Sequence, residues 1–345
     1  MHHGYLNLES LWFALITVLW IGYFFLEGFD FGVGVLLPFL GRDEVDRRVL
    51  VNSIGPVWDG NEVWLLVAGG ATFAAFPEWY ATLFSGFYLA LFVILIALIV
   101  RGVAFEFRGK DKLPAWRAWW DRAIFWGSLV PAILWGVAFA NILRGVPIRD
   151  GEWVGSFFDL LNPYALLAGV TSLLLFTVHG ATFLTLKTDG EVRDRSRVTA
   201  KRLAPLAALA VLGFLTWTFF NARGNDGVVP GVIPVTAIVA IAAVEWLVRE
   251  KLDGWAFLLT GIAIAAITAT IFLNLYPRVM VSSLGASQDL TIWNAASTPY
   301  TLKIMTIVAL IFTPIVLGYQ AWTYWVFRKR ISRSDVEAAS GEAAA

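Results

Sequence analysis

The sequence contains no cysteine among its 345 residues. This absence excludes disulfide bonds, thiolate-bound iron–sulfur clusters, covalent haem attachment through a CxxCH motif and cysteine nucleophiles. Histidine and methionine are also scarce, with three residues of each, and these side chains are the usual axial ligands of a b-type haem. The sequence therefore offers few groups with which to hold a redox cofactor of its own.

Charged residues are few as well, at 15% of the chain, and the 26 basic residues balance the 26 acidic ones. A zero net charge excludes the broad basic surface with which proteins bind nucleic acid. By contrast, 58% of the residues are hydrophobic and the mean hydropathy is +0.69, more than a water-soluble domain can solvate. The 17 tryptophans suit a membrane–water interface. We therefore expect an integral membrane protein.

Apolar stretches long enough to cross a bilayer recur along the chain. Eight are plain, at 11–37, 80–105, 123–143, 161–186, 203–220, 228–248, 255–276 and 301–327. A ninth is less plain, because the apolar run from Val63 to Phe76 would rise only about 21 Å, short of a bilayer core of roughly 30 Å. Extending it back to Ile54 gives a span at 54–76. The expected fold is an all-α polytopic membrane protein with about nine transmembrane helices.

Lysine and arginine are distributed unevenly between alternate loops. Five loops carry 21 of the 26 basic residues, at 42–48, 101–122, 187–202, 249–251 and 328–333. Because basic loops stay on the cytoplasmic side, we expect the N-terminus outside and the C-terminus in the cytoplasm, which requires an odd number of spans. No connection is long enough for a soluble domain, so 1–330 is expected to form one membrane domain and 331–345 a polar cytoplasmic tail.

Acidic residues lie inside or at the ends of the first two spans, where charge is costly and usually serves a function. Glu27 and Asp30 are three residues apart and therefore share one face of the first helix. Asp59 and Glu62 repeat this spacing in the second span. Both pairs lie toward the cytoplasmic side, so we expect four carboxylates to gather there.

The third span reaches the same membrane depth at Arg101 and Glu106. One interpretation of this acidic cluster is a proton-uptake path from the cytoplasm, because buried carboxylates can pass protons along hydrogen-bonded water. The other is a structural network of ion pairs around Arg101 that fixes helix packing and conducts nothing. The sequence leaves both interpretations open.

His179 is the only histidine inside a predicted span, so it is a candidate axial ligand of a haem. A second ligand would have to be Met280 or Met305, and both lie near the opposite face of the membrane. A hydrogen bond from His179 to a neighbouring helix is the alternative. Since no GxxxxGK[ST], HExxH or complete GxGxxG motif is present either, we expect this chain alone to bind no cofactor and no metal.

Small residues concentrate in the first two spans. Gly28 and Gly32 form a GxxxG pattern, which favours close helix packing over a nucleotide-binding loop. Trp64 precedes the small residues at 68–71, which would let another helix or a small apolar molecule approach closely. Helix packing and a passage for a small molecule are the two interpretations of this segment.

Two long segments carry a family resemblance. Glu27-Gly-Phe-Asp-Phe-Gly-Val-Gly34 and Gly55-Pro-Val-Trp-Asp-Gly-Asn-Glu-Val-Trp64 resemble subunit II of cytochrome bd oxidases. The resemblance continues through Phe84-Ser-Gly-Phe-Tyr88, Arg101-Gly-Val-Ala-Phe-Glu106, Gly136-Val-Ala-Phe-Ala-Asn141 and Thr301-Leu-Lys-Ile-Met-Thr306. It therefore covers nearly the whole chain.

The resemblance implies a nine-helix subunit of the bacterial inner membrane, with one peripheral helix followed by two four-helix bundles. It implies pairing with a similarly folded subunit I that carries two b-type haems and one d-type haem. The complex of this family oxidises quinol and reduces oxygen to water. A small single-helix accessory subunit, a structural quinone and membrane lipid are further partners that such a complex admits.

The resemblance also implies roles for individual residues. Asp59 matches the carboxylate at the cytoplasmic end of a proton path between the two subunits, with Asp30 and Arg101 as polar neighbours. Glu27 and Glu62 stand where other members carry different polar residues.

The same resemblance matches Trp64 to a residue near an oxygen-access tunnel, whereas His179 matches no haem ligand. An alternative from another class is a proton-coupled secondary transporter, which would also combine many spans with few charges. The chain shows no obvious inverted repeat, which such transporters often contain. A purely structural membrane partner is a third possibility.

Overall fold

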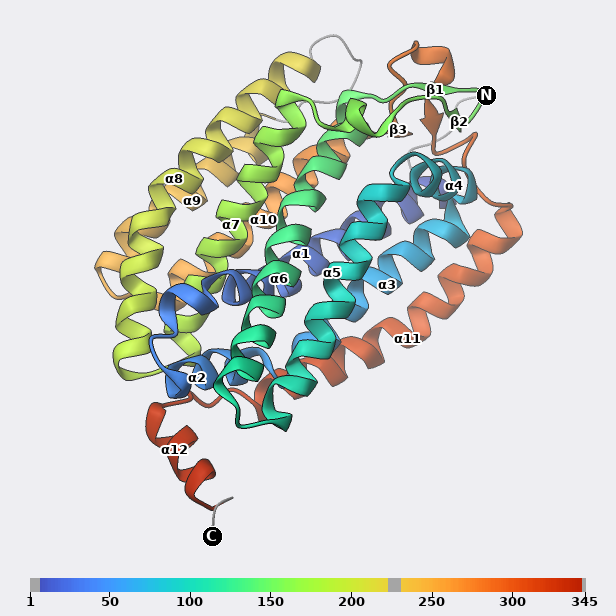
Figure 1. Ribbon diagram of the computed structural model, residues 1–345. Coiled ribbons are helices and arrows are strands. Elements are labelled where there is room, and N and C mark those ends of the chain that lie inside the picture. Colours follow the sequence, from blue (N-terminus) through green and yellow to red (C-terminus); the bar gives the residue numbers. More distant parts are fainter. Residues whose placement is uncertain (1–6, 223–230, 343–345) are drawn as a thin grey trace.

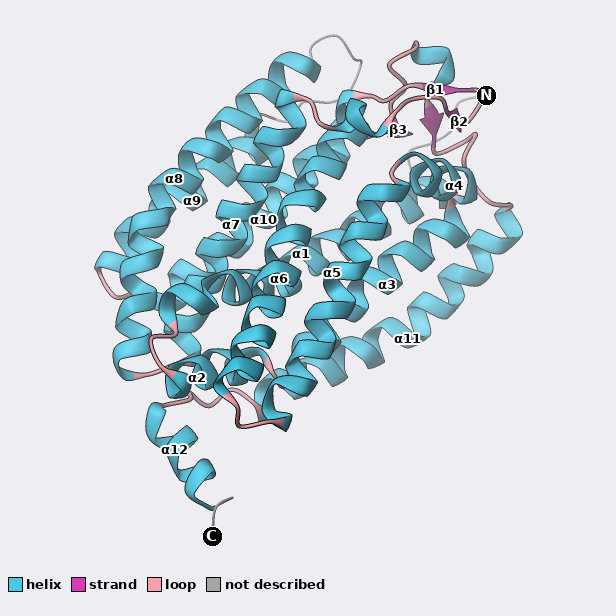
Figure 2. Cartoon of the chain, in the orientation of Figure 1, coloured by secondary structure: helices cyan, strands magenta, loops and turns pink. Residues whose placement is uncertain are grey.

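The computed structural model describes residues 7–222 and 231–342, and helices make up most of it (Figures 1 and 2). The long helices are α1 (Leu8–Leu40), α3 (Trp58–Ala75), α5 (Tyr88–Phe107), α6 (Pro114–Arg144), α7 (Pro163–Lys187), α8 (Gly190–Ala222), α9 (Val232–Arg249), α10 (Asp253–Leu275) and α11 (Pro299–Val326). The shorter helices are α2 (Glu44–Ile54), α4 (Pro77–Gly86), α12 (Arg333–Glu342) and the 3-10 turns Arg108–Lys110, Phe157–Leu160 and Ala286–Gln288. Two antiparallel strand pairs complete the described chain, β1 (Ile148–Arg149) with β2 (Glu152–Trp153) and β3 (Arg278–Met280) with β4 (Leu290–Thr291).

Eight of the described helices are long and apolar enough to cross a membrane, namely all of the long helices except α3. α3 is the ninth, and its 18 residues rise about 27 Å, close to the thickness of a bilayer core. Each of the nine predicted spans thus contains one long helix. The prediction of an all-α polytopic membrane protein is confirmed.

Two predicted spans differ from the helices that form. The second span was expected to extend back to Ile54, and this is wrong, because α2 ends there and α3 begins at Trp58. Pro56 lies in the break, where its ring nitrogen has no hydrogen to donate to a helix. The third span, expected from 80 to 105, is divided at Phe87 into α4 and α5. Gly86, a poor helix former, precedes that division.

The long helices form two groups of four with one helix outside them. α1, α3, α5 and α6 form the first group, and α7, α8, α9 and α10 form the second. α1 also packs against α7 and α10, so it joins the two groups. The resemblance implied that the peripheral helix comes first, and the structure places it last. Only 6% of the most apolar segment of α11 is buried, against 44% for α1, and α11 runs along the edge of the molecule (Figure 1).

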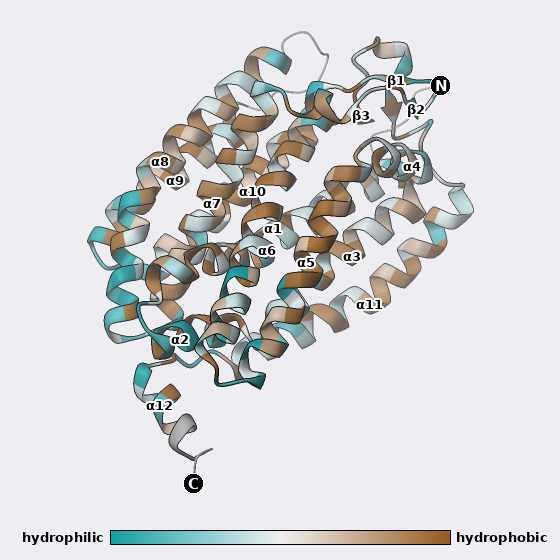
Figure 3. Ribbon diagram, in the orientation of Figure 1, coloured by the Kyte–Doolittle hydropathy of each residue, from teal (hydrophilic) through white to brown (hydrophobic). Residues whose placement is uncertain are grey.

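Hydrophilic residues gather at one end of the helices, around α2, α12 and the start of α8 (Figure 3). The basic loops that were assigned to the cytoplasm connect helices at this end. This end is therefore the predicted cytoplasmic face of the protein.

The predicted polar tail contains a helix that packs against α2. Arg333, the first residue of α12, donates to Asp43 Oδ2 at 2.8 Å and to Asp46 Oδ1 at 2.5 Å. Asp46 is only 1% exposed and also accepts from Arg195 of α8 at 2.5 Å. Val336, on the next turn of α12, is buried. A shared carboxylate therefore ties the C-terminal helix to α2 and α8.

Replacing Arg333 by glutamine is expected to release α12 from α2. The guanidinium of Arg333 lowers the pKa of Asp43, so the ion pair contributes stability above the unfolded pKa of about 3.9 and loses it as the pH falls through the lower, folded pKa. At neutral pH the variant should show several-fold faster amide exchange in 333–342, while Arg330→Gln, which removes an exposed cation nearby, should not. Equal exchange rates in α12 for the variant and the wild type would contradict this role.

Candidate functional site

Three charged residues are completely buried in the first helix group. α1 contributes Glu27 and Asp30, and α5 contributes Arg101, each with an exposed fraction of 0%. Arg101 Nη2 donates a hydrogen bond to Glu27 and another, at 3.3 Å, to Glu62 Oε2 of α3. The guanidinium carbon lies 4.7 Å from the centre of the Phe31 ring. One cation therefore links carboxylates from two helices against an aromatic wall.

Asp30 belongs to a second network that links α1, α3 and α11. Asn61 Nδ2 donates to Asp30 Oδ2 at 2.7 Å. Asn61 Oδ1 accepts from the Tyr324 hydroxyl at 2.7 Å and from Gln320 Nε2 at 3.4 Å. Gln320 Oε1 in turn accepts from Trp64 Nε1 at 2.8 Å. Polar side chains thus form a continuous chain from Asp30 to the peripheral helix.

The remaining predicted carboxylates are more exposed than Glu27 and Asp30. Asp59 is exposed in the first turn of α3, where its side chain accepts from the Gly60 backbone N–H at 2.7 Å. Glu62 lies one turn further along the same helix, and its side chain is 23% exposed. Glu106 is exposed on α5 and, among the described residues, forms no ion pair. The structure therefore brings Glu27, Asp30, Arg101 and Glu62 together, sets Asp59 at their outer side and leaves Glu106 apart.

Several atoms of the buried charged groups have no hydrogen-bond partner among the described residues. These atoms are Glu27 Oε2, Asp30 Oδ1, Arg101 Nε and Arg101 Nη1. Buried polar atoms are almost always paired with protein or with ordered water, because an unpaired one costs about 1–3 kcal/mol. The cluster therefore has free donor and acceptor positions that suit water.

Three members of these networks, Asn61, Gln320 and Tyr324, were not among the site residues predicted from the sequence. Gln320 and Tyr324 lie four residues apart in an otherwise apolar span, so they share one face of α11. A glutamine and a tyrosine at helical spacing inside a transmembrane segment are a signal that could have been used.

The chain matches one protein-family model and several curated relatives. The model of cytochrome bd terminal oxidase subunit II matches residues 8–327. This chain belongs to that family. A cytochrome bd ubiquinol oxidase subunit 2 of Bacillus subtilis is 46% identical over 334 residues, covering 95% of this chain and 98% of the relative. A cytochrome bd-I ubiquinol oxidase subunit 2 of Escherichia coli K12 is 39% identical over 368 residues, covering 96% and 97%.

A solved structure supports the fold. A chain of the bd oxidase from Geobacillus thermodenitrificans superimposes with a TM-score of 0.71 at 18% sequence identity, covering 93% of this chain and 99% of that chain. Together with the eight apolar helices, the family membership identifies a multi-pass protein of the bacterial inner membrane. The proton-coupled transporter considered from composition receives no support from these relatives.

In this subunit II chain, His179 is fully buried on α7 and both of its ring nitrogens are engaged. Nε2 donates to the Phe25 carbonyl at 3.0 Å, since a carbonyl can only accept, and Nδ1 therefore accepts from the Thr260 hydroxyl at 2.6 Å. The imidazole also stacks on Phe257, with 4.6 Å between ring centres. These contacts join α7 to α1 and α10 and leave neither nitrogen free for iron, so His179 does not fit the role of a haem ligand.

The glycines of α1 allow close contact with α7. A Cβ atom on Gly32 would lie 2.1 Å from the Phe176 carbonyl oxygen, and one on Gly28 would lie 2.8 Å from the Phe176 ring. Gly180 of α7 faces Gly32 backbone to backbone. The prediction that the GxxxG pattern serves helix packing is confirmed.

Trp64 packs against a glycine of α1. A Cβ atom on Gly22 would lie 2.1 Å from the indole ring of Trp64. Gly69 and Gly70, in the small-residue segment of the same helix, have no atom within 4 Å of the place a Cβ would take. They line an apolar cleft of about 470 Å³ between α3, α4, α5 and α6. Trp64 therefore packs between helices, and the small residues beyond it open onto a cleft.

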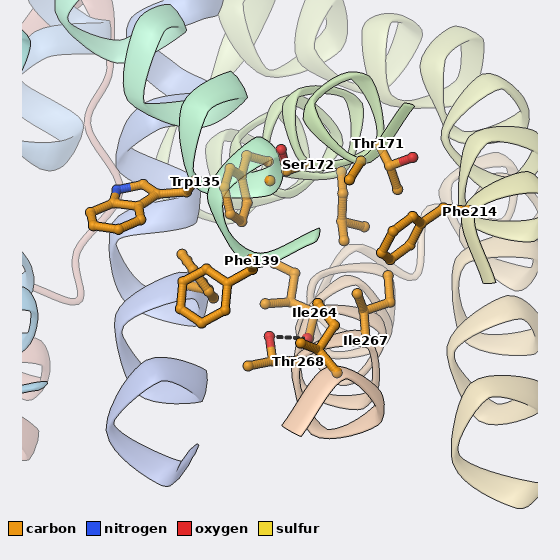
Figure 4. A pocket seen from close by; sticks show the side chains of 14 residues that line it. Trp135, Phe139, Thr171, Ser172, Phe214, Ile264, Ile267 and Thr268 are labelled. Atoms are coloured by element: carbon orange, nitrogen blue, oxygen red, sulfur yellow. Dashed lines mark hydrogen bonds between the residues drawn. The ribbon is translucent and has the colours of Figure 1, made fainter. Parts of the chain in front are cut away.

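A smaller cavity of about 50 Å³ lies between α1, α6, α7, α8 and α10 (Figure 4). Its wall is apolar except for three hydroxyl groups. Those of Thr171 and Thr268 donate to carbonyls one turn back in their own helices, at 2.8 and 2.9 Å. The hydroxyl of Ser172 donates to the Ala132 carbonyl at 2.6 Å. Because these donors are already used, the cavity offers a water molecule few partners.

Proposed function

We propose that this chain is the haem-free subunit II of a membrane complex that oxidises quinol and reduces oxygen to water. Its membership of the subunit II family supports this, as do relatives whose names describe ubiquinol oxidase subunits. The redox chemistry would belong to a partner, subunit I, with two b-type haems and one d-type haem. This chain would support that partner, and a small single-helix accessory subunit could join them. The isolated chain would be inactive.

We also propose that this subunit supplies cytoplasmic protons to the complex. The observation that carries the proposal is the decrease in exposure from Asp59, on the surface, through the half-buried Glu62 to the fully buried Glu27 and Asp30. Carboxylates inside a membrane protein are costly and usually mark ion or proton pathways. Water at the unpaired oxygens of Glu27 and Asp30 would connect them, since each has an acceptor position to spare.

The competing interpretation, a purely structural ion-pair network, suits one part of the cluster better than the other. Arg101 links Glu27 to Glu62 and so fastens three helices together. Asp59 makes no ion pair within the described chain and is exposed. A structural role therefore fits the Arg101 ion pairs, whereas Asp59 has no evident structural task.

Replacing Asp59 by asparagine is expected to slow oxygen consumption by the assembled complex about a hundredfold, the lower end of the effect of removing one positioned proton-transfer group. The asparagine keeps the size of the side chain and can still accept from the Gly60 N–H, so the fold should persist. The measurement is oxygen consumption and proton uptake by the complex in vesicles, at equal haem content from the reduced-minus-oxidised spectrum.

Glu78→Gln is the matched control, because Glu78 is also an exposed acid in the first turn of a helix, α4, away from the cluster. Its activity should stay at the wild-type rate. Unchanged turnover in the Asp59 variant would leave the cluster structural.

We further propose that the apolar cleft beside Gly69 and Gly70 holds a structural quinone or a lipid chain. Its 470 Å³ lies within the range of small-molecule sites, and aromatic side chains such as Trp79 and Tyr88 line it. We also propose that Trp64, on the same helix, is an oxygen-access residue, because the small residues beyond it would let an apolar molecule approach.

A further inference from the structure

A third apolar pocket lies at the end of the molecule that carries α2 and α12. Its volume is about 320 Å³, and it is enclosed by α1, α7, α10 and α11 together with the turn before α3. Five phenylalanines line it, namely Phe25, Phe29, Phe183, Phe257 and Phe327. The pocket therefore suits an apolar occupant.

Two cations also line this pocket. Lys187 is the last residue of α7, and Arg328 lies two residues beyond the end of α11. Both therefore lie at the ends of membrane-spanning helices, where the headgroups of a bilayer begin. An apolar pocket with cations at headgroup depth matches the two parts of a phospholipid.

The structure holds both cations in place without neutralising them. Lys187 Nζ donates to the carbonyls of Phe327 and Lys329, the latter at 3.0 Å. Arg328 Nη1 donates to the Trp325 carbonyl at 2.5 Å, and its guanidinium carbon lies 4.4 Å from the centre of the Trp325 ring.

Within the described residues neither the half-buried Lys187 nor the exposed Arg328 forms an ion pair, although most of the buried or half-buried arginines at this end do. The lysine has three donor hydrogens and uses two, while the arginine has five and uses one. Free donors and uncompensated positive charge therefore remain at the pocket.

We propose that this pocket binds one anionic phospholipid, with an acyl chain among the phenylalanines and the phosphate between Lys187 and Arg328. Basic pockets between transmembrane helices recognise anionic headgroups in this way. A zwitterionic lipid would bring its own positive charge to the two cations, so charge complementarity selects an anionic headgroup. The site is distinct from the cleft beside Gly69 and shares one wall residue, Tyr324, with the hydrogen-bond network around Asp30.

The test is native mass spectrometry of the whole complex, purified with its partner subunit and reconstituted with phosphatidylcholine containing a titrated fraction of phosphatidylglycerol. The double variant Lys187→Gln with Arg328→Gln should lose one bound phosphatidylglycerol, or should bind it roughly thirty-fold more weakly, as expected for the loss of two surface cations. Glutamine retains an N–H donor for the carbonyls that position Lys187. Lys201→Gln with Arg202→Gln is the control, since it removes two exposed cations from α8 and should leave phosphatidylglycerol binding unchanged.

A second variant, Leu186→Trp, adds volume at the half-buried Leu186 of the pocket wall without changing charge and should also remove the bound lipid. Haem content and gel filtration establish that each complex is assembled. Equal binding of phosphatidylglycerol by wild type and the double variant would overturn the proposal. So would equal competition by phosphatidylcholine, or displacement of the lipid by inorganic phosphate alone, which would indicate an anion site without an acyl chain.

Discussion

Replacing Arg101 by glutamine is expected to prevent a stable, haem-bearing complex from accumulating. Arg101 is fully buried and is the only ion-pair partner of Glu27 among the described residues. Removing one member of a buried ion pair typically costs about 3–5 kcal/mol, because the other charge stays buried without a partner. That loss is a large part of the roughly 5–15 kcal/mol that stabilises an ordinary domain. The measurement is the yield and the thermal unfolding midpoint of the complex.

Arg122→Gln is the matched control, since Arg122 is an exposed cation at the same end of the first helix group. It should unfold at the wild-type temperature. The double variant Glu27→Gln with Arg101→Gln should recover part of the loss, because position 27 no longer carries a buried charge without a partner and only the partly exposed Glu62 loses its cation. If the double variant is as unstable as the sum of the two single variants, Glu27 and Arg101 are not coupled and the expectation is wrong.

Replacing Gly32 by alanine is expected to separate α1 from α7 and to destabilise the subunit. The new methyl group would lie 2.1 Å from the Phe176 carbonyl oxygen and 2.8 Å from Gly180 Cα. Both are backbone atoms, so no side chain can rotate away and one helix must shift. Overpacking of this kind costs about 1–3 kcal/mol or more, which outweighs the gain of up to about 1 kcal/mol from the higher helix propensity of alanine. A lower unfolding midpoint and a lower yield of the complex are the expected results.

Gly213→Ala isolates the steric part of this effect. Gly213 also lies inside a long helix, α8, but a Cβ there would meet only Leu167 Cδ2 at 3.9 Å, an ordinary contact. This variant should be neutral or slightly stabilising. If both alanine variants unfold at the same temperature, close contact between α1 and α7 is not what requires the glycine.

The number and order of the spans could be predicted from the sequence, because crossing a bilayer requires a run of about 20 apolar residues whatever lies beside it. Each predicted span contains a long helix, although Pro56 and Gly86 interrupt two of them. The close packing at Gly28 and Gly32 could also be predicted, since the pattern states which residues share a helix face. Span length and GxxxG spacing depend on residues that are close together in the chain, so both can be read directly from the sequence.

Membership of the acidic cluster could be predicted only in part. Hydropathy indicated that six charged residues lie at a similar depth in the membrane. Depth alone does not determine the direction in which each side chain points. Glu106 turned out to be exposed, and Gln320 joined the network instead.

The amino-acid sequence thus determined that this chain is a multi-pass membrane protein of the cytochrome bd subunit II family, and which acidic residues it places in the membrane. Tertiary structure decided that α1 is central and α11 peripheral, that Arg101 pairs with Glu27, and that Lys187 and Arg328 meet at one pocket. The physical reason is that hydropathy and periodicity describe one helix at a time. Which helices pack together depends on contacts between residues hundreds of positions apart, such as the hydrogen bond from Tyr324 to Asn61.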